Sequence, residues 1–331
     1  MDPYVDVLRP LLFRLNPDDV HALARLALKW PATWRLLAGP PPPETLATNL
    51  AGIRLATPIG LAPGFDKSGE LLPSLAHLGF GYLTVGSITK APRWGNPFPR
   101  LVRYPEKESL ANSMGLPNPG LAAAVENLKR APRIPPVIAS VAGFSVDELL
   151  ECAAAVEPHV AAVEIGLVCP NTTETERLEE MRLFTELVAQ LAQRKTKPVF
   201  VKLPPHHDDG QKAQALAMVD ACVEAGIDGV TAYASKPTVE PRLGVGRGSL
   251  AGRAVFQDAL RIVGDVADRA QGRLAIKGAG GIFTGADARR LLDAGATTVE
   301  LYSAFIYRGW NVARSIAQEL AETDWRSPRA A

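Results

Sequence analysis

The most reactive side chain in this sequence follows an apolar stretch. Residues 163–168 read Val-Glu-Ile-Gly-Leu-Val, a pattern that predicts a buried β-strand, and Cys169, Pro170 and Asn171 come directly after them. Because proline cannot continue the hydrogen-bond ladder of a sheet, the strand is expected to end there. A thiol at a strand end can act as a base, and the neighbouring amide can hold a polar substrate. The alternative is that Cys169 is a small buried hydrophobic residue, as free cysteines commonly are.

Two lysines lie where apolar runs meet loops. Lys67 belongs to the segment Gly64–Ser68, and Lys202 stands between Val201 and Leu203. A lysine inside an apolar strand is costly to bury unless an anion or a polar partner meets it. We therefore expect a phosphate-bearing or otherwise anionic cofactor near Lys202. The alternative is a lysine whose long stem reaches solvent at the rim of the sheet.

Glycine-rich and histidine-rich segments suggest further sites. The run Gly278–Ile282 contains Gly280 and Gly281, which allow a close approach of the backbone to a phosphate. The run Gly244–Gly248 lacks the third glycine at the spacing that a dinucleotide-binding loop requires, and it is interpreted as an ordinary loop of the barrel. Residues 206–209 read His-His-Asp-Asp, but an aspartate cap for a helix starting near Gln211 explains them better than a metal, so no metal site is predicted.

The composition limits the function classes. The 331 residues are 47% hydrophobic and 21% charged, which is enough for a barrel-sized core. With 36 basic and 35 acidic side chains the net charge is +1, so no nucleic-acid partner is expected, and no feature indicates a protein partner. The three cysteines form no C-x-x-C pair, which predicts a reducing, cytoplasmic compartment. Neither a secretory signal nor an apolar run of spanning length is visible.

Short apolar runs alternate with amphipathic segments along most of the chain. The expected strands are residues 59–62, 82–85, 137–141, 162–167, 198–203, 229–232, 274–277 and 298–302. The expected helices between them include residues 145–156, 176–193, 211–225, 254–270 and 285–294. Eight such units predict an α/β protein with a (β/α)8 TIM barrel, with a doubly wound open sheet as the alternative. In a barrel, the loops after the strands carry the active site.

The N-terminal residues are organised differently. Residues 1 to about 38 predict two short helices, the second starting at Asn16 and Pro17, and four prolines at 40–43 form a stiff linker. We expect two parts, a helical segment over residues 1–43 and a barrel over residues 44–331. The helical segment carries more apolar surface than two short helices can bury. It must therefore dock on the barrel, or face a membrane surface or an apolar ligand.

The chain resembles the dihydroorotate dehydrogenases, which are FMN enzymes built on a TIM barrel. The motifs that carry the resemblance are Leu61–Lys67, Gly86–Thr89, Gly95–Pro97, Pro99–Leu101, Asn112–Asn118, Cys169–Asn171, Val201–Lys202, Gly278–Ile282 and Leu301–Ser303. The helical extension resembles that of the quinone-reducing, membrane-associated class, where such helices form the quinone tunnel. The resemblance therefore implies a peripheral protein on the inner face of the cell membrane, and a step of pyrimidine biosynthesis.

The resemblance also implies roles for individual residues. Cys169 stands at the catalytic base, and Lys67 is the second catalytic residue. The implied substrate contacts are Asn112, Met114, Gly115, Leu116, Asn171 and Ser235. The implied FMN contacts are Ala62, Lys67, Ser87, Ser140, Lys202, Gly252, Gly280, Gly281, Tyr302 and Ser303. The implied quinone contacts are His21, Arg103 and Tyr302.

Three positions depart from the family pattern. The quinone-linked class usually has serine where this chain has Cys169, and two asparagines that grip the pyrimidine are replaced by Gly166 and Ala234. Tyr233 and Lys236 are candidates for compensating contacts. The principal expectation is oxidation of dihydroorotate or a related dihydro compound to a C=C product, with electrons passing through FMN to a quinone. The alternatives are an FMN enzyme acting on another conjugated carbonyl compound, because lost amides leave polar ligand groups unsatisfied, and a non-catalytic FMN-binding barrel.

Overall fold

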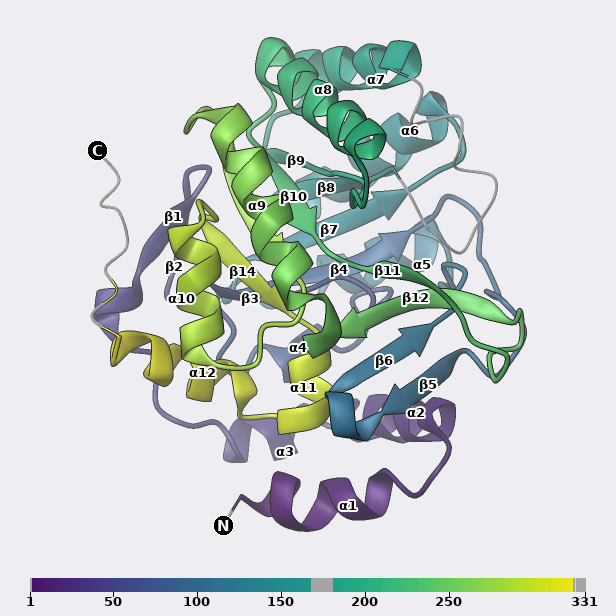
Figure 1. Ribbon diagram of the computed structural model, residues 1–331, viewed down its shortest axis with the longest axis vertical. Helices are drawn as coiled ribbons and strands as arrows, with labels where there is room; N and C mark the ends of the chain where they lie inside the picture. The colour runs from purple at the N-terminus through teal and green to yellow at the C-terminus, as the bar shows by residue number, and fades with distance from the viewer. Residues whose placement is uncertain (1, 168–180, 324, 326–331) are drawn as a thin grey trace.

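The chain folds into a closed barrel of eight parallel strands, which confirms the predicted fold class (Figure 1). The structure is a computed structural model that describes residues 2–167, 181–323 and 325. In barrel order the strands are β3 (Ile59–Leu61), β4 (Tyr82–Ile88), β7 (Val137–Ala142), β8 (Ala162–Gly166), β9 (Val199–Lys202), β10 (Gly229–Tyr233), β13 (Ala275–Ala279) and β14 (Thr298–Leu301). Each of these strands pairs with the next one in this order, and β14 closes onto β3. All eight predicted strands are present.

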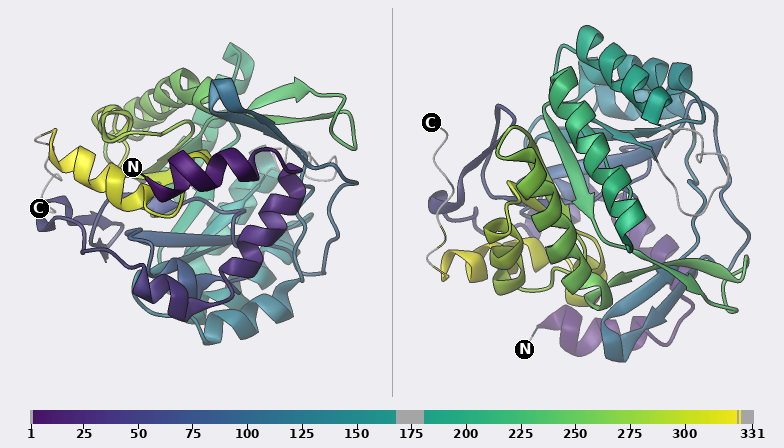
Figure 2. Two further views of the ribbon diagram at one scale, coloured as in Figure 1. Left: turned by 90° about the horizontal axis from the view of Figure 1, so that it is seen from below. Right: turned by 45° about the horizontal axis from the view of Figure 1, so that its top comes forward.

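Helices cover the outside of the barrel (Figure 2). They are α4 (Leu72–Leu75), α5 (Leu121–Lys129), α6 (Val146–Val156), α7 (Met181–Arg194), α8 (Asp209–Ala225), α9 (Phe256–Ala270), α10 (Gly285–Asp293), α11 (Ser303–Arg308) and α12 (Val312–Ala321). Local signals explain several starts. The Oδ1 atom of Asp208 accepts the Gln211 N–H at 2.8 Å, which confirms the predicted aspartate cap of α8. Thr284 and Asp287 form a capping box at the start of α10.

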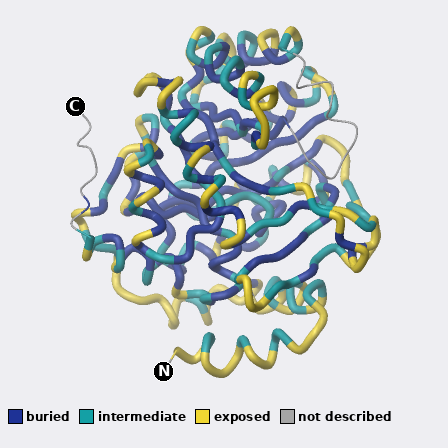
Figure 3. The backbone as a smooth tube through the Cα atoms, in the orientation of Figure 1, coloured by how far each residue is buried: buried dark blue, intermediate teal, exposed yellow. Residues whose placement is uncertain are grey.

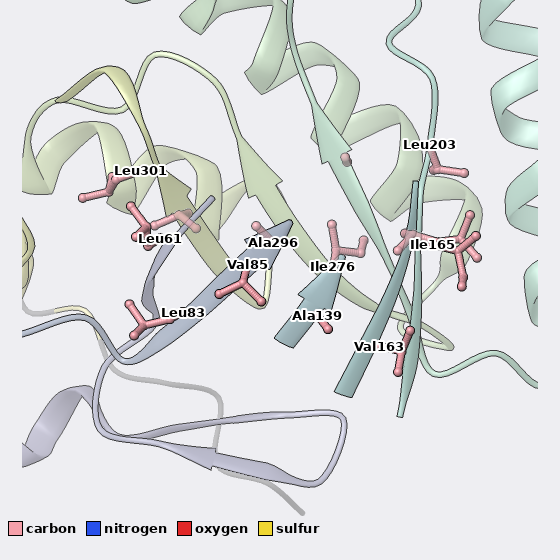
Figure 4. Close-up of a cluster of buried hydrophobic side chains, with 14 of the residues drawn as sticks. Leu61, Leu83, Val85, Ala139, Val163, Ile165, Leu203, Ile276, Ala296 and Leu301 are labelled. Carbon is pink, nitrogen blue, oxygen red and sulfur yellow. The ribbon is translucent and has the colours of Figure 1, made fainter. Parts of the chain in front are cut away.

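Alternation along the strands separates an outer apolar layer from the barrel interior. Buried side chains such as Leu83, Val163, Ile165, Ile276 and Leu301 form one large core (Figure 4). Side chains of the opposite parity fill the barrel, because successive residues of a strand face opposite sides. At the C-terminal ends of the strands, the inward-facing residues are followed directly by the loops. Together these residues and loops line the end of the barrel where active sites lie.

Two additions to the barrel were not predicted. β1 (Thr48–Leu50) and β2 (Ile53–Leu55) form a hairpin. A four-stranded antiparallel sheet contains β5 (Leu101–Tyr104), β6 (Ser109–Asn112), β11 (Lys236–Val239) and β12 (Arg247–Gly252) in the order β11-β12-β6-β5. It joins the loop after β4 to the loop after β10, and so brings the Asn112 region next to the Gly252 region.

The N-terminal segment has more breaks than the two predicted helices. It consists of a helical stretch that runs as η1 (Pro3–Leu8) and α1 (Arg9–Leu12), followed by α2 (Pro17–Ala27) and α3 (Pro31–Leu36). Asn16 caps α2, as predicted, and Pro31 starts the additional helix α3. The segment lies against β5 and α11, and much of its outer side is exposed (Figures 1 and 3). No described helix is long and apolar enough to cross a membrane.

Gly60 is required at the bottom of the barrel. A Cβ atom there would lie 2.2 Å from the Cζ atom of Tyr82, whose ring is fully buried. We expect Gly60→Ala to lower the free energy of unfolding by about 1–3 kcal/mol, because the Tyr82 ring must move within a packed core. Gly264→Ala on α9 is the matched control, since nothing lies within 4 Å of the added Cβ. It is expected to raise stability by about 0.5–1 kcal/mol. Urea unfolding of both variants measures the difference, and equal effects would contradict this packing.

Candidate active site

A cavity of about 270 Å³, here called the barrel cavity, lies at the C-terminal end of the strands. It brings together most of the side chains that the sequence singled out. Among the predicted residues, those that line it are Ala62, Lys67, Ser87, Asn112, Met114, Leu116, Lys202, Ser235, Gly252, Gly280, Gly281, Tyr302 and Ser303. They come from the ends of β3, β4, β9, β10, β13 and β14 and from the added sheet. The loops after the strands therefore converge on one site, as expected of a TIM barrel.

Ser140 and Gly115 do not line this cavity but lie next to residues that do. The hydroxyl oxygens of Ser140 and Ser87 are 3.4 Å apart. Gly115 has a φ of +70°, and a Cβ there would lie 2.7 Å from side-chain atoms of Asn96. Gly115 therefore shapes the loop that carries Met114 and Leu116 into the cavity.

The loop after β13 suits a phosphate group. Gly280 and Gly281 have φ values of +129° and +72°, in a region that favours glycine. A Cβ on Gly281 would lie 2.7 Å from the carbonyl oxygen of Gly252. The backbone N–H groups of both glycines donate to no acceptor within the described part of the chain. They lie near the start of the short helix α11, which is where barrels commonly bind phosphate.

Lys202 is half-buried at the end of β9 and lines the barrel cavity. Its Nζ atom lies 4.4 Å from the centre of the Tyr233 ring. No carboxylate within the described ranges lies within ion-pair distance of it. Lys202 therefore presents its charge to the cavity, and its anion-binding role stays a prediction.

Lys67 and His21 connect the barrel to the N-terminal segment. The Nζ atom of Lys67 donates to the carbonyl oxygen of Gly64 at 2.8 Å and lies 3.4 Å from Nε2 of His21. Burial lowers the pKa of Lys67 to about 8. Burial, followed by the charges of Lys67 and Arg25, lowers the pKa of His21 to about 3. His21 is therefore neutral near pH 7, and its ring nitrogen can accept a hydrogen bond from Lys67.

A second cavity of about 300 Å³, here called the helical cavity, lies between the N-terminal segment and the barrel. Its walls are mainly apolar and include His21 and Arg103, two of the three predicted quinone contacts. Tyr302, the third, lines the barrel cavity instead. Its ring contacts Phe65, which lines the helical cavity, with ring centres 6.2 Å apart. Leu101 and Leu110 line both cavities. The two cavities are therefore separated by a single layer of side chains.

Sequence reasoning missed three charged groups inside the barrel. Glu164, Lys277 and Glu300 are buried, and the Lys277 Nζ atom lies 2.6 Å from Glu164 and 3.1 Å from Glu300. Glu300 also lines the barrel cavity. The sequence did contain a signal for them. Each of the three is a charged residue in an otherwise apolar strand, at a position whose side chain faces the barrel interior.

The replaced positions lie near the site. Ala234 lines the barrel cavity, and a Cβ on Gly166 would lie 3.3 Å from the Val141 carbonyl oxygen and 3.8 and 3.9 Å from the hydroxyl oxygens of Ser87 and Ser140. Tyr233 also lines the cavity. Lys236 does not, since it pairs with Asp258 of α9 at 2.7 Å. Of the two candidates for compensating contacts, only Tyr233 is therefore in position.

Three other predicted residues are not among the described residues that line the cavity. Cys169 and Asn171, the predicted base and one substrate contact, lie outside the described residues. The Nε2 atom of His206 lies 3.0 Å from Asp265, away from the barrel cavity. Among the residues that the structure describes, no group of three or more His, Cys, Asp or Glu side chains could hold a metal ion.

Comparisons with known proteins agree with this geometry. The family model described as dihydroorotate dehydrogenase matches residues 45–323. A dihydroorotate dehydrogenase (quinone) of Methylococcus capsulatus is 35% identical over 329 residues, covering 92% of this chain and 95% of the relative. Another, from a Roseiflexus species, is 34% identical and covers 95% and 92%. The crystal structure of DHODH in complex with ferulenol from Eimeria tenella superimposes with a TM-score of 0.82 at 25% identity, covering 96% of both chains.

Sequence similarity and architecture thus lead to the same result. The family match spans the barrel, and the two relatives match over 92% and 95% of this chain. The closed eight-stranded barrel and its cavity are the features that the resemblance predicted. The chain belongs to the dihydroorotate dehydrogenase family.

Proposed function

We propose that this protein is an FMN-dependent dehydrogenase that oxidises dihydroorotate to orotate at the barrel cavity and reduces a quinone at the helical cavity. The observation that carries the proposal is the pair of adjacent cavities, one with Lys67, Lys202 and other polar side chains in its lining, the other almost entirely apolar. The relatives named above are dihydroorotate dehydrogenases (quinone), so neither a different carbonyl substrate nor a non-catalytic barrel is favoured.

The residues that line the barrel cavity support FMN as the cofactor. The backbone N–H groups of Gly280 and Gly281 would hold the phosphate, and Lys202 would face the ring system. FMN, when bound, accepts a hydride from the substrate and passes two electrons on to the quinone. Backbone atoms leave no room for a Cβ at Gly281, so the loop is shaped for close approach. These residues and the other FMN contacts named from the sequence form our proposed cofactor site.

The chain's own groups supply the remaining chemistry. Asn112, whose Nδ2 atom donates to the Ser249 carbonyl oxygen at 3.4 Å, would hold the polar edge of the substrate together with Ser235 and Asn171. Cys169, as a thiolate, would take the proton from the carbon next to the one that gives the hydride. A thiol has a reference pKa of about 8.5, which makes it a better base near neutrality than a hydroxyl.

Arg103 provides a test of the helical cavity. Its guanidinium lies over the Phe13 ring, 4.5 Å from the centre, and donates to the carbonyl oxygens of Leu12 and Leu15. We expect Arg103→Ala to raise the KM for a short-chain quinone about tenfold or more, because a charged hydrogen-bond donor contributes about 1.5–3 kcal/mol. The rate at which dihydroorotate reduces the bound flavin should stay unchanged.

The matched control is Arg269→Ala, since Arg269 pairs with Asp220 on the surface. Steady-state assays with quinone and anaerobic stopped-flow with dihydroorotate measure the two half-reactions. An Arg103 variant that slows flavin reduction as much as it weakens quinone use would contradict separate cavities.

We further propose that residues 1–43 attach the protein peripherally to the cytoplasmic face of the cell membrane. Among the described residues, nine of the fourteen exposed large hydrophobic side chains belong to the first 37 residues. Trp30 and Leu36 are 68% and 85% exposed. Exposed apolar residues gathered on one helical segment are typical of interfacial helices.

This attachment predicts a loss of vesicle binding on removing those side chains. We expect the double variant Trp30→Ser and Leu36→Ser to bind phospholipid vesicles at least tenfold more weakly in sedimentation assays, because each buried apolar side chain contributes about 1.5–3 kcal/mol. Ile134→Ser, in the loop before β7 and 84% exposed, is the control and should bind as the parent protein does. An equal loss of vesicle binding in the double variant and in Ile134→Ser would argue against a membrane-binding surface on residues 1–43.

The proposed activity is tested with the purified protein under anaerobic conditions. The protein is expected to be yellow. Dihydroorotate should bleach the flavin absorbance, and one orotate should be released for each flavin that is reduced. A colourless protein would contradict the cofactor site, and a yellow protein that bleaches only with other dihydro compounds would contradict the substrate.

A further inference from the structure

The middle layer of the barrel interior is polar. Thr84, Glu164, Thr231, Lys277 and Glu300 are all at most 2% exposed. Barrel interiors are usually filled by branched apolar residues, and burying charges costs free energy that their mutual attraction often fails to recover. Stability alone therefore gives no reason for a carboxylate–lysine–carboxylate group at this depth.

Two carboxyl groups compete for one ammonium in this layer. Lys277 Nζ lies 2.6 Å from Glu164 Oε2 and 3.1 Å from Glu300 Oε1. Thr231 donates to Glu164 at 2.6 Å, and Thr84 donates to Glu300 at 2.8 Å. The other oxygens, Glu164 Oε1 and Glu300 Oε2, have no hydrogen-bond partner among the described residues. Glu164 has the closer contact with the ammonium, so it is the better candidate for the ionised member of the pair.

The surroundings of the two carboxyl groups also favour ionisation of Glu164 over ionisation of Glu300. The charged and titratable groups that act on Glu300 from the packed strands are Lys277 of β13, Glu164 of β8, Lys202 of β9 and Tyr82 of β4. Burial is the main cause that raises the pKa of Glu300, and the charge of Glu164 adds to it. The attraction of Lys277 and Lys202 overcomes burial at Glu164 and lowers its pKa to about 2.

Hydrogen bonding places the proton of a neutral Glu300. Oε1 already accepts from Thr84 and Lys277, whereas Oε2 has no partner among the described residues. A protonated carboxyl group has one O–H donor, and only Oε2 is free to carry it. Glu300 also lines the barrel cavity, so its protonation state bears directly on the charge that a ligand there meets.

We propose that Glu300 is a neutral carboxylic acid in the working protein, and that its neutrality leaves the charge of Lys202 uncompensated for the ligand of the barrel cavity. Lys277 and Glu164 cancel each other, so Lys202 remains as the net charge of the four groups. An ionised Glu300 would cancel it. Glu300 is thus a positioning residue that acts on the cofactor through the electrostatic field of the cavity. This role rests on the proposed FMN site, whereas the protonation of Glu300 does not.

Infrared spectroscopy tests the proton directly. The difference between the spectra of the parent protein and Glu300→Gln at pH 7 should contain the C=O stretch of a protonated carboxylic acid. Glutamine has the shape of the neutral acid, so the variant is expected to fold. If the spectrum of Glu300 is that of a carboxylate, the proposal is overturned, whether or not FMN is bound.

The reduction potential of bound FMN tests the consequence. Glu300→Gln should leave the equilibrium constant for two-electron reduction within about threefold of the parent value, because a neutral group replaces a neutral group. Lys277→Met should lower it at least tenfold, about 30 mV, because Glu164 then compensates Lys202. A tenfold or larger shift in Glu300→Gln, or an unchanged potential in a folded Lys277→Met, would overturn the proposal. If Lys277→Met does not fold, the infrared spectrum and the potential of Glu300→Gln decide.

Discussion

Replacing Cys169 with alanine is expected to slow reduction of the bound flavin by dihydroorotate by about 10²- to 10⁴-fold, the usual contribution of a positioned general base. The expectation rests on the sequence, where Cys169 follows the strand β8 and stands at the base position of the family. FMN content and reoxidation by quinone should not change, because neither uses the thiol. Anaerobic stopped-flow measurement of the flavin absorbance separates the half-reactions.

The two other cysteines are the matched controls. Cys152 in α6 and Cys222 in α8 are buried, and burial raises the pKa of their thiols to about 11 and about 12. Neither can act as a base near neutral pH, so their alanine variants should reduce the flavin at the parent rate. If Cys169→Ala does so as well, Cys169 has no part in proton removal.

Replacing Lys277 with methionine is expected to lower the free energy of unfolding by about 3–5 kcal/mol. Removing one partner of a buried ion pair leaves the other without its contact partner, here the carboxylate of Glu164, 2.6 Å from the lost ammonium and too far from Lys202 to form an ion pair with it. The double variant Lys277→Met and Glu164→Gln removes the whole pair. It should recover most of the lost stability, since a neutral pair requires no counter-charge.

The effect of Lys277→Met on stability is expected to depend on pH. The pKa of Glu164 is lowered from 4.5 to about 2, mainly by Lys277. The ion pair therefore contributes its full stability above pH 4.5 and loses it as the pH falls toward 2. The stability difference between the parent protein and Lys277→Met, measured by urea unfolding, should shrink over that range. A difference that grows as the pH falls would contradict an ionised Glu164.

The barrel could be predicted from the sequence because its signals are local. Mainly apolar runs such as Val137–Val141, separated by amphipathic helices with their own caps, specify strand and helix independently of the rest of the chain. The candidate site followed from the barrel, since the loops after parallel strands meet at one end. Tyr302 and Gly280 each follow the end of a barrel strand. The sequence could therefore predict that both line the same cavity, although they belong to different loops.

Other features depend on contacts between distant residues. The sheet of β5, β6, β11 and β12 joins two loops more than 100 residues apart, and no periodicity within either loop records that pairing. The ion pair of Lys277 with Glu164 and Glu300 spans three strands, and each residue alone is one charged side chain in an apolar run. Pro31 is a local signal for the start of a third helix, which the prediction of two helices did not use.

The central claim is that two adjacent cavities divide one reaction between dihydroorotate and a quinone, and a sequential-mixing experiment tests it most directly. The protein is first bleached anaerobically with one equivalent of dihydroorotate and then mixed with a short-chain quinone, with NAD⁺ or with fumarate. We predict rapid return of the flavin absorbance with the quinone alone. Flavin that dihydroorotate fails to bleach, or that NAD⁺ or fumarate reoxidises faster than the quinone does, would contradict the account.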